Sequence, residues 1–229
     1  MGGILDAFQP EWSTPQQFVG WFDQKLAESR RREFRRSALL HEREGGWKLF
    51  YEELFPLYRL LQKKLLDWSD VEFKPLPGNQ PGVDVEVKSR RSPFFRYIEI
   101  TQADMDQEER WRTEAFSEHG SVTLGTPVSK ENGRISVGND PVDCADLRQE
   151  KVRLIRIAIK RKIKRFSRSR SDDIALLIYF DDCLYPFEDA DGDKEVDALL
   201  DSVSNIWSSY TRLFLVGARE GYWERQAPA

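Results

Sequence analysis

Apolar and polar residues alternate along two neighbouring stretches in the first half of the chain. Valines occupy every second position of 83–88 and alternate with charged residues, which is the period of a half-buried strand. A second run, 94–101, places Glu99 and Thr101 on the same face. The linker 89–93 is short and polar, as hairpin connections are. The pattern therefore predicts two paired strands.

Helical spacing predicts two helices before these strands. Thr14, Pro15 and Gln17 form a capping-box arrangement, which marks a helix start, and this helix is expected to reach about Leu40. A second helix is indicated by apolar residues three and four positions apart. They are Trp47, Phe50, Leu54, Leu57, Leu61 and Leu65. Pro56 lies within this series and is expected to kink or split the helix.

The remaining elements alternate between helices and strands. We predict a strand at 71–73, a polar helix over 103–118, a hairpin insertion at 121–138, a basic helix over 143–168, a buried strand at 174–180, a helix over 194–210 and a strand at 213–217. The hairpin is expected to pair 122–124 with 134–137 through the turn dipeptide Asn132-Gly133. The tail after Gly221 is interpreted as loose.

The order of elements predicts an α/β fold. Two strands joined by a crossover helix pair in parallel, whereas the strands joined by the short linker 89–93 pair antiparallel. The sheet should therefore be mixed and flanked by helices. At 229 residues one domain is the default. We divide it into a helical extension at 1–46, a core at 47–181, and a helix and strand at 182–229.

Composition narrows the class of protein. The longest apolar run, 174–180, is too short to cross a bilayer, and no secretory signal pattern is visible at the N-terminus. Cys144 and Cys183 have neither metal-binding spacing nor the density of a disulfide scaffold. The sequence therefore predicts a cytoplasmic protein with no membrane association; it does not indicate an oligomeric state.

Charge is distributed unevenly along the chain. Residues 151–170 contain ten Lys or Arg and no acid, so a net charge of −4 for the whole chain leaves −14 on the other residues. Phosphate backbones respond to such local potential. We predict that this helix binds DNA or RNA, mainly through phosphates; the alternative is an ordinary solvated helix face. The residues expected to contact nucleic acid are Lys160, Arg161, Lys164, Arg165 and Arg168.

Two acidic residues on the paired strands are the main candidates for chemistry. Asp84 and Glu99 can converge if their strands pair, and oxygen ligands of this kind hold hard divalent cations. We predict a Mg²⁺ or Mn²⁺ site formed by Asp84, Glu99 and the carbonyl oxygen of Ile100. The alternative is a pair of solvent-facing acids on an ordinary hairpin.

These residues resemble a known superfamily. The stretch Pro81-Gly82-Val83-Asp84 and the stretch Glu99-Ile100-Thr101 are similar to the first acid and the E-x-K segment of PD-(D/E)XK, or restriction-endonuclease-like, nucleases. The resemblance covers about residues 47–181. It implies a core of one helix, three antiparallel strands, a crossover helix and a fourth strand, with metal-dependent cleavage of phosphodiesters.

Thr101 departs from this pattern, because it stands where the superfamily has a lysine. That lysine polarises the attacking water or stabilises the charge that develops on phosphorus, and Thr101 brings a hydroxyl to position the water but no positive charge. Three replacements are open. Lys88 shares a strand face with Asp84, Gln102 follows the motif directly, and the basic helix offers Lys160 or Lys164.

The sequence thus supports three functional hypotheses. The first is a divalent-metal-dependent nuclease, an endonuclease or an exonuclease, that is slow because it lacks the motif lysine. The second is a catalytically degenerate relative that binds nucleic acid or a protein partner. The third is an acidic scaffold whose basic helix meets an acidic partner.

Overall fold

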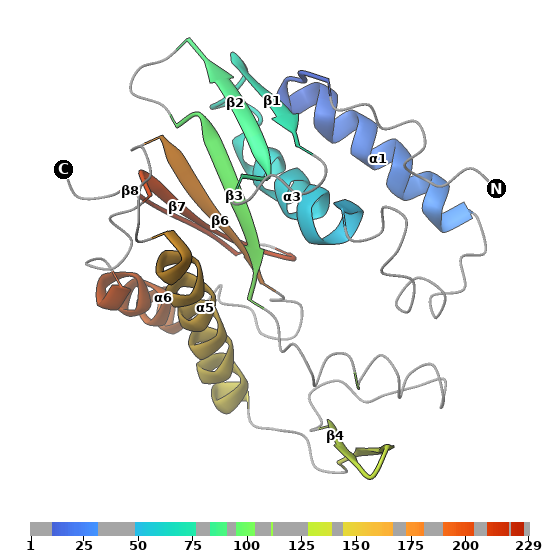
Figure 1. Ribbon diagram of the computed structural model, residues 1–229, viewed down its shortest axis with the longest axis vertical. Coiled ribbons are helices and arrows are strands. Elements are labelled where there is room, and N and C mark those ends of the chain that lie inside the picture. The colour runs from blue at the N-terminus through green and yellow to red at the C-terminus, as the bar shows by residue number, and fades with distance from the viewer. Residues whose placement is uncertain are drawn as a thin grey trace.

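The protein is an α/β fold in which a mixed sheet lies between helices, as the order of elements predicts (Figure 1). The computed structural model describes residues 11–31, 49–76, 83–90, 95–103, 111, 128–138, 144–166, 173–180, 190–203, 210–219 and 221–226. The predicted helix at 103–118 lies almost wholly outside this part of the chain.

The main sheet has six strands. In order across the sheet they are β1 (Val71–Pro75), β2 (Val85–Ser89), β3 (Tyr97–Gln102), β6 (Ile174–Phe180), β7 (Arg212–Gly217) and β8 (Tyr222–Gln226). β3, β6 and β7 run parallel, and the other neighbours are antiparallel. The parallel pairs require crossovers, and these are the segments that contain the helices.

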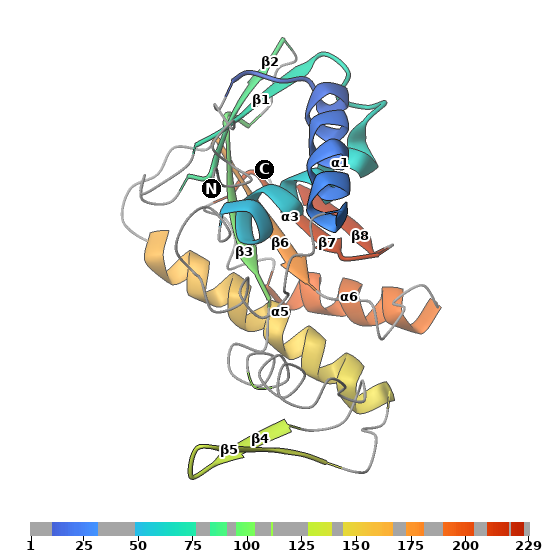
Figure 2. The ribbon, with the colours of Figure 1, turned by 90° about the vertical axis from the view of Figure 1, so that its right-hand side faces the viewer.

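Helices cover both faces of the sheet and create two apolar cores (Figure 2). One core lies under α1 (Pro15–Arg31), the π-helical turn η1 (Leu49–Leu54) and α3 (Phe55–Lys64); the other lies under α5 (Cys144–Phe166) and α6 (Ala190–Val203). β6 serves both, because Leu177 enters the first core and Leu176 and Ile178 enter the second. All three are fully buried, as an unbroken apolar strand requires.

Two helix signals in the sequence are confirmed. The Gln17 side chain accepts a hydrogen bond from the Thr14 N–H at 2.9 Å, and the Thr14 hydroxyl accepts one from the Gln17 N–H at 3.3 Å, which is the reciprocal capping box. Pro56 lies in the first turn of α3, directly after η1. It divides the predicted helix there because proline has no N–H to donate and clashes with the preceding turn.

The hairpin forms a separate two-stranded sheet below α5 in both views (Figures 1 and 2). Asn132 and Gly133 connect its strands with φ of 50° and 79°, as a tight hairpin turn requires. The partner of β5 (Arg134–Val137) is β4 (Val128–Glu131), which adjoins the turn. Because β5 pairs with β4, the predicted pairing is wrong in its first strand; residues 122–124 lie outside the described residues.

The end of the chain also differs from the prediction. Residues 222–226 are not a loose tail but form β8, which pairs antiparallel with β7. The segment does not alternate between apolar and polar residues. As an edge strand it can form all the same, because its charged side chains stay partly solvated. Within the described segments, none of the helices combines the length and the hydrophobicity that a membrane span needs.

Candidate active site between β2, β3 and α5

The candidate site forms where β2 and β3 stop pairing. Their register places Val85 opposite Ile98, and Asp84 directly precedes Val85. The main chain of Asp84 is held on both sides: its N–H donates to the Ile98 carbonyl at 3.0 Å, and its carbonyl accepts from the Leu76 N–H at 2.8 Å. These bonds fix the position from which the Asp84 side chain extends.

Ile100 lies two residues beyond Ile98, the last position of β3 that pairs with β2. Its main-chain N–H and carbonyl point toward the β2 side, like those of Ile98. At this position, however, they bond to side chains instead of to the main chain of β2. The Ile100 N–H donates to Asp84 Oδ2 at 2.6 Å, and the Ile100 carbonyl accepts from Lys162 Nζ at 3.2 Å. Buried main-chain groups that lack a hydrogen bond destabilise the fold. Asp84 and Lys162 supply the hydrogen bonds of Ile100 that β2 would otherwise make.

Glu99 is the centre of the cluster. Its Oε1 lies 2.8 Å from Lys162 Nζ, and its Oε2 accepts a 2.6 Å hydrogen bond from the hydroxyl of Tyr210, just before β7. Only 2% of Glu99 is exposed, and it is the one charged residue that is buried within the described part of the chain. A buried carboxylate needs such partners.

Burial dominates the electrostatic environment of Glu99. Burial raises the pKa of Glu99 above its ordinary value of 4.5. The charge and hydrogen bond of Lys162 and the hydrogen bond from Tyr210 oppose this rise, whereas the nearby charge of Asp84 adds to it. Two carboxylates and one ammonium therefore interact within one small volume, as is common at functional sites.

The structure brings together three of the residues predicted to form the site, namely Asp84, Glu99 and Ile100. It does not bring Lys88 to them, because the Lys88 ammonium lies 3.5 Å from the centroid of the Trp12 ring. Thr101 is partly buried in β3, on the same strand face as Glu99 by alternation. Its predicted role in positioning water remains a prediction.

The basic residues of α5 lie at exposed and at partly buried positions. Lys160, Arg161 and Lys164 are exposed, so neither of the two predicted replacement lysines faces the sheet. The side chain of Arg165 and the whole of Arg168 lie outside the described residues. Contact between this helix and nucleic acid remains a prediction.

Sequence reasoning missed Lys162 and Tyr210. A signal for Lys162 was present: it follows Ile155 by seven residues and Ile159 by three, so it lies on the sheet-facing stripe of α5. Lys160 and Lys164 are two positions away on either side, which turns them to the opposite face. No sequence signal pointed to Tyr210, which lies 111 positions from Glu99.

The donor atoms of the cluster suit a hard divalent cation. Asp84 and Glu99 supply carboxylate oxygens and Ile100 a carbonyl oxygen, which are ligands that Mg²⁺ and Mn²⁺ accept. A cationic group, the Lys162 ammonium, already lies against two of these donors. Within the described residues no group of three or more His, Cys, Asp or Glu gathers, so a site here would depend on the carbonyl and on water.

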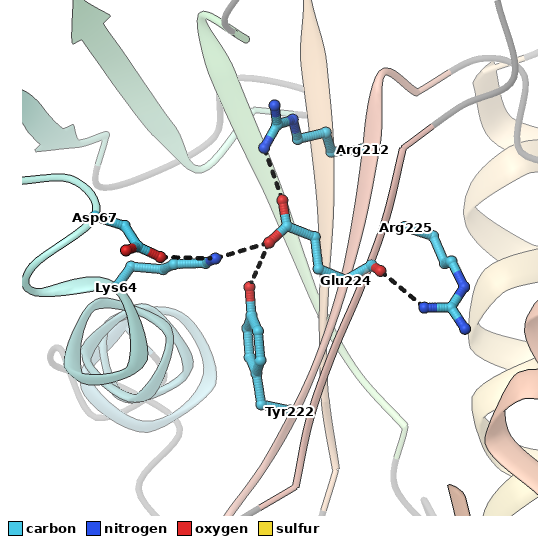
Figure 3. Close-up of polar contacts among 6 residues, drawn as sticks. All are labelled: Lys64, Asp67, Arg212, Tyr222, Glu224 and Arg225. Atoms are coloured by element: carbon cyan, nitrogen blue, oxygen red, sulfur yellow. Dashed lines mark hydrogen bonds and ion pairs between the residues drawn. The ribbon is translucent and has the colours of Figure 1, made fainter. Parts of the chain in front are cut away.

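A second polar cluster lies on the opposite face of the sheet, where α3 meets β7 and β8 (Figure 3). The Glu224 carboxylate contacts Arg212 Nη1 at 2.7 Å, Lys64 Nζ at 2.8 Å and the Tyr222 hydroxyl at 2.8 Å. Lys64 also pairs with Asp67 at 3.3 Å. Because its charges are matched and join three elements, we interpret this cluster as a connection that holds the edge strand β8.

Glu224→Gln is expected to lower the free energy of unfolding by about 1 kcal/mol near neutral pH, a value reduced for partial exposure. Burial by itself raises the pKa of Glu224, but hydrogen bonds from Lys64 and Tyr222 and the charges of Lys64 and Arg212 outweigh it, so the pKa is lowered from 4.5. The stabilisation is therefore complete above the unfolded-state pKa and lost as pH falls through the folded-state pKa.

Urea denaturation of wild type and Glu224→Gln at neutral and acidic pH checks this. The difference in unfolding free energy should shrink in acid, and Glu72→Gln, an exposed change on β1, should have little effect at either pH. A difference that persists unchanged in acid would contradict the assignment.

Comparisons with known protein families, curated proteins and solved structures find no match to this chain. Its function is therefore inferred from the residues and contacts described above.

Proposed function

We propose that this chain is a divalent-metal-dependent nuclease with a restriction-endonuclease-like core. The observation that carries the proposal is the convergence of Asp84, Glu99 and Lys162 around Ile100. Two acids on diverging strands and one lysine are the groups that the PD-(D/E)XK motif combines. Here the lysine comes from α5, whereas the motif position on β3 is Thr101.

The residues divide the chemical work in a way that fits phosphodiester hydrolysis. Asp84, Glu99 and the Ile100 carbonyl would hold Mg²⁺ or Mn²⁺, which lowers the pKa of a bound water and offsets phosphate charge. The Lys162 ammonium would stabilise negative charge on the phosphate as water attacks phosphorus and the bond to the leaving oxygen breaks. Tyr210 holds Glu99 Oε2 at 2.6 Å and so fixes the orientation of the carboxylate.

The exposed face of α5 supports nucleic acid as the substrate class. Lys160, Arg161 and Lys164 are exposed and lie within one turn of Lys162, separated from it by at most about the helix diameter of 10 Å. That separation is similar to the Debye length at moderate salt. The helix would therefore attract a phosphate backbone toward the site without reading its sequence.

One observation favours a second function, a degenerate module that binds nucleic acid without cleaving it. Both oxygens of Glu99 are engaged, by Lys162 and Tyr210, and the residue is almost completely buried. If Lys162 never left Glu99, the ammonium would replace the metal permanently. Binding would then persist and hydrolysis would not occur.

Incubation of the purified protein with plasmid, linear DNA and RNA, with Mg²⁺, Mn²⁺ or a chelator, tests the proposal. Wild-type protein should cleave at least one substrate only when the metal is present. Asp84→Asn keeps an acceptor for the Ile100 N–H but removes the charge, so it should fold and not cleave. Asp146→Asn, an exposed change on α5, is the matched control and should cleave normally.

Two outcomes would contradict the nuclease proposal. Cleavage that survives in Asp84→Asn would come from a contaminant or another site. Absence of cleavage in every protein and metal, together with salt-dependent binding of nucleic acid, would favour the degenerate module.

A further inference from the structure

The Lys162 ammonium lies where a metal ion would have to bind. It is 2.8 Å from Glu99 Oε1 and 3.2 Å from the Ile100 carbonyl oxygen. These are two of the three donors that the proposed function assigns to the cation. The third, Asp84, is fixed beside them through its 2.6 Å bond from the Ile100 N–H.

The other oxygen of Glu99 offers no alternative position. Tyr210 donates to Oε2 at 2.6 Å, and Tyr210 is itself 2% exposed. A cation that used Oε2 would have to displace this buried hydroxyl. Oε1 is the oxygen on the side of the Ile100 carbonyl, since Lys162 Nζ contacts both atoms.

We propose that Lys162 and a divalent cation bind this site in alternation, so that Lys162 acts as an internal counter-cation that gates metal loading. The inference rests on the proposed function and concerns its regulation. A monovalent and a divalent cation on the same two oxygens repel each other strongly in a partly buried site. The metal must therefore move Lys162 away from Glu99 before it can bind.

This exchange has a consequence for both states of the protein. Without metal, Lys162 neutralises the buried Glu99 and keeps the donors in place. With metal, the released ammonium is available to a phosphate at the same site. The gate weakens the affinity for free metal, because part of the binding free energy is used to break the Lys162–Glu99 pair.

Amine labelling of wild-type protein tests the exchange directly. Acetylation of each lysine is measured by peptide mass spectrometry with and without saturating Mg²⁺. Lys162 is now largely buried, with 15% of its side chain exposed, and its labelling should rise several-fold with Mg²⁺. Lys160 and Lys164 are exposed neighbours that should label equally in both conditions. Unchanged or reduced labelling of Lys162, with Mg²⁺ shown to be bound, would overturn the proposal.

Titration calorimetry with Mn²⁺ tests the energetic consequence. Lys162→Met should bind Mn²⁺ at least about tenfold more tightly than wild type, whereas Lys160→Met should bind like wild type. Circular dichroism and thermal melting establish that each variant is folded.

The outcomes separate this inference from the proposed function. Equal or weaker Mn²⁺ binding by Lys162→Met than by wild type overturns the gate and leaves the nuclease proposal intact. Binding by the variant alone supports mutual exclusion but overturns the nuclease proposal, because the natural site would then never load. Failure of both proteins to bind Mn²⁺ overturns both.

Discussion

Replacing Lys162 with methionine is expected to lower the rate constant of metal-dependent cleavage by about 10²–10³-fold, the usual cost of losing one preorganised electrostatic group. The Lys162 ammonium contacts both Glu99 and the Ile100 carbonyl, so it lies at the atoms proposed to hold the reacting centre. Methionine keeps an unbranched, flexible side chain and removes the ammonium, with its charge and its hydrogen-bond donors. Initial rates at saturating metal and nucleic acid separate this loss from changes in binding.

Lys160→Met and Lys164→Met are the matched controls for this measurement. They make the same chemical change on the same helix, but at exposed positions. We expect them to weaken nucleic acid binding, most strongly at low salt, and to leave the saturated rate nearly unchanged. Equal losses in all three variants would indicate a general electrostatic effect, and an unaffected Lys162→Met would remove Lys162 from the proposed chemistry.

The same substitution is also expected to lower the free energy of unfolding by about 3 kcal/mol, because removing one partner of a buried ion pair leaves the other charge uncompensated. Only 3% of the Glu99 side chain is exposed, against 15% for Lys162. Glu99 therefore cannot turn to solvent when Lys162 is lost. Chemical denaturation followed by circular dichroism measures the difference.

A double-mutant cycle identifies the pair as the cause. Glu99→Gln alone should also destabilise, since Lys162 loses its counter-charge, but less, because a long lysine can extend toward solvent. The double variant Glu99→Gln, Lys162→Met should recover much of the loss, because it leaves no buried charge. Additive losses would mean that the two residues contribute independently and would contradict the structural argument.

The pH dependence has a defined sign. The pKa of Glu99 is raised in the folded protein by burial, so protonation of Glu99 favours the folded state. Stability contributed by this group is present at low pH and declines as pH rises through the folded-state pKa. Without Lys162 the pKa rises further, so the difference between wild type and Lys162→Met should be larger at about pH 8 than at about pH 5.

The local pattern of the sequence was enough to predict the strands that carry the two acids of the site. Alternation over 83–88 and 94–101 indicated paired strands, and pairing was enough to expect Asp84 and Glu99 to approach each other. The capping box at Thr14 and the break at Pro56 were also readable, because both depend on hydrogen bonds between residues a few positions apart.

The choice of lysine required the helix to be placed against the sheet. The lysines of α5 belong to one basic run, and composition alone does not distinguish the buried-facing lysine from the exposed ones. Their roles differ because the apolar stripe that includes Ile155 and Ile159 sets the roll of the helix. That roll turns Lys162 toward Glu99 and leaves Lys160 and Lys164 exposed.

Distant contacts were beyond the reach of the sequence. Tyr210 reaches Glu99 because β6 pairs with both β3 and β7, and the polar strand β8 exists because β7 offers it an edge. Short-range periodicity thus determined which segments become strands and helices, since hydrogen bonding and amphipathicity act over a few residues. Only the tertiary structure decided which charges share the buried site, because burial and pairing depend on how those segments pack.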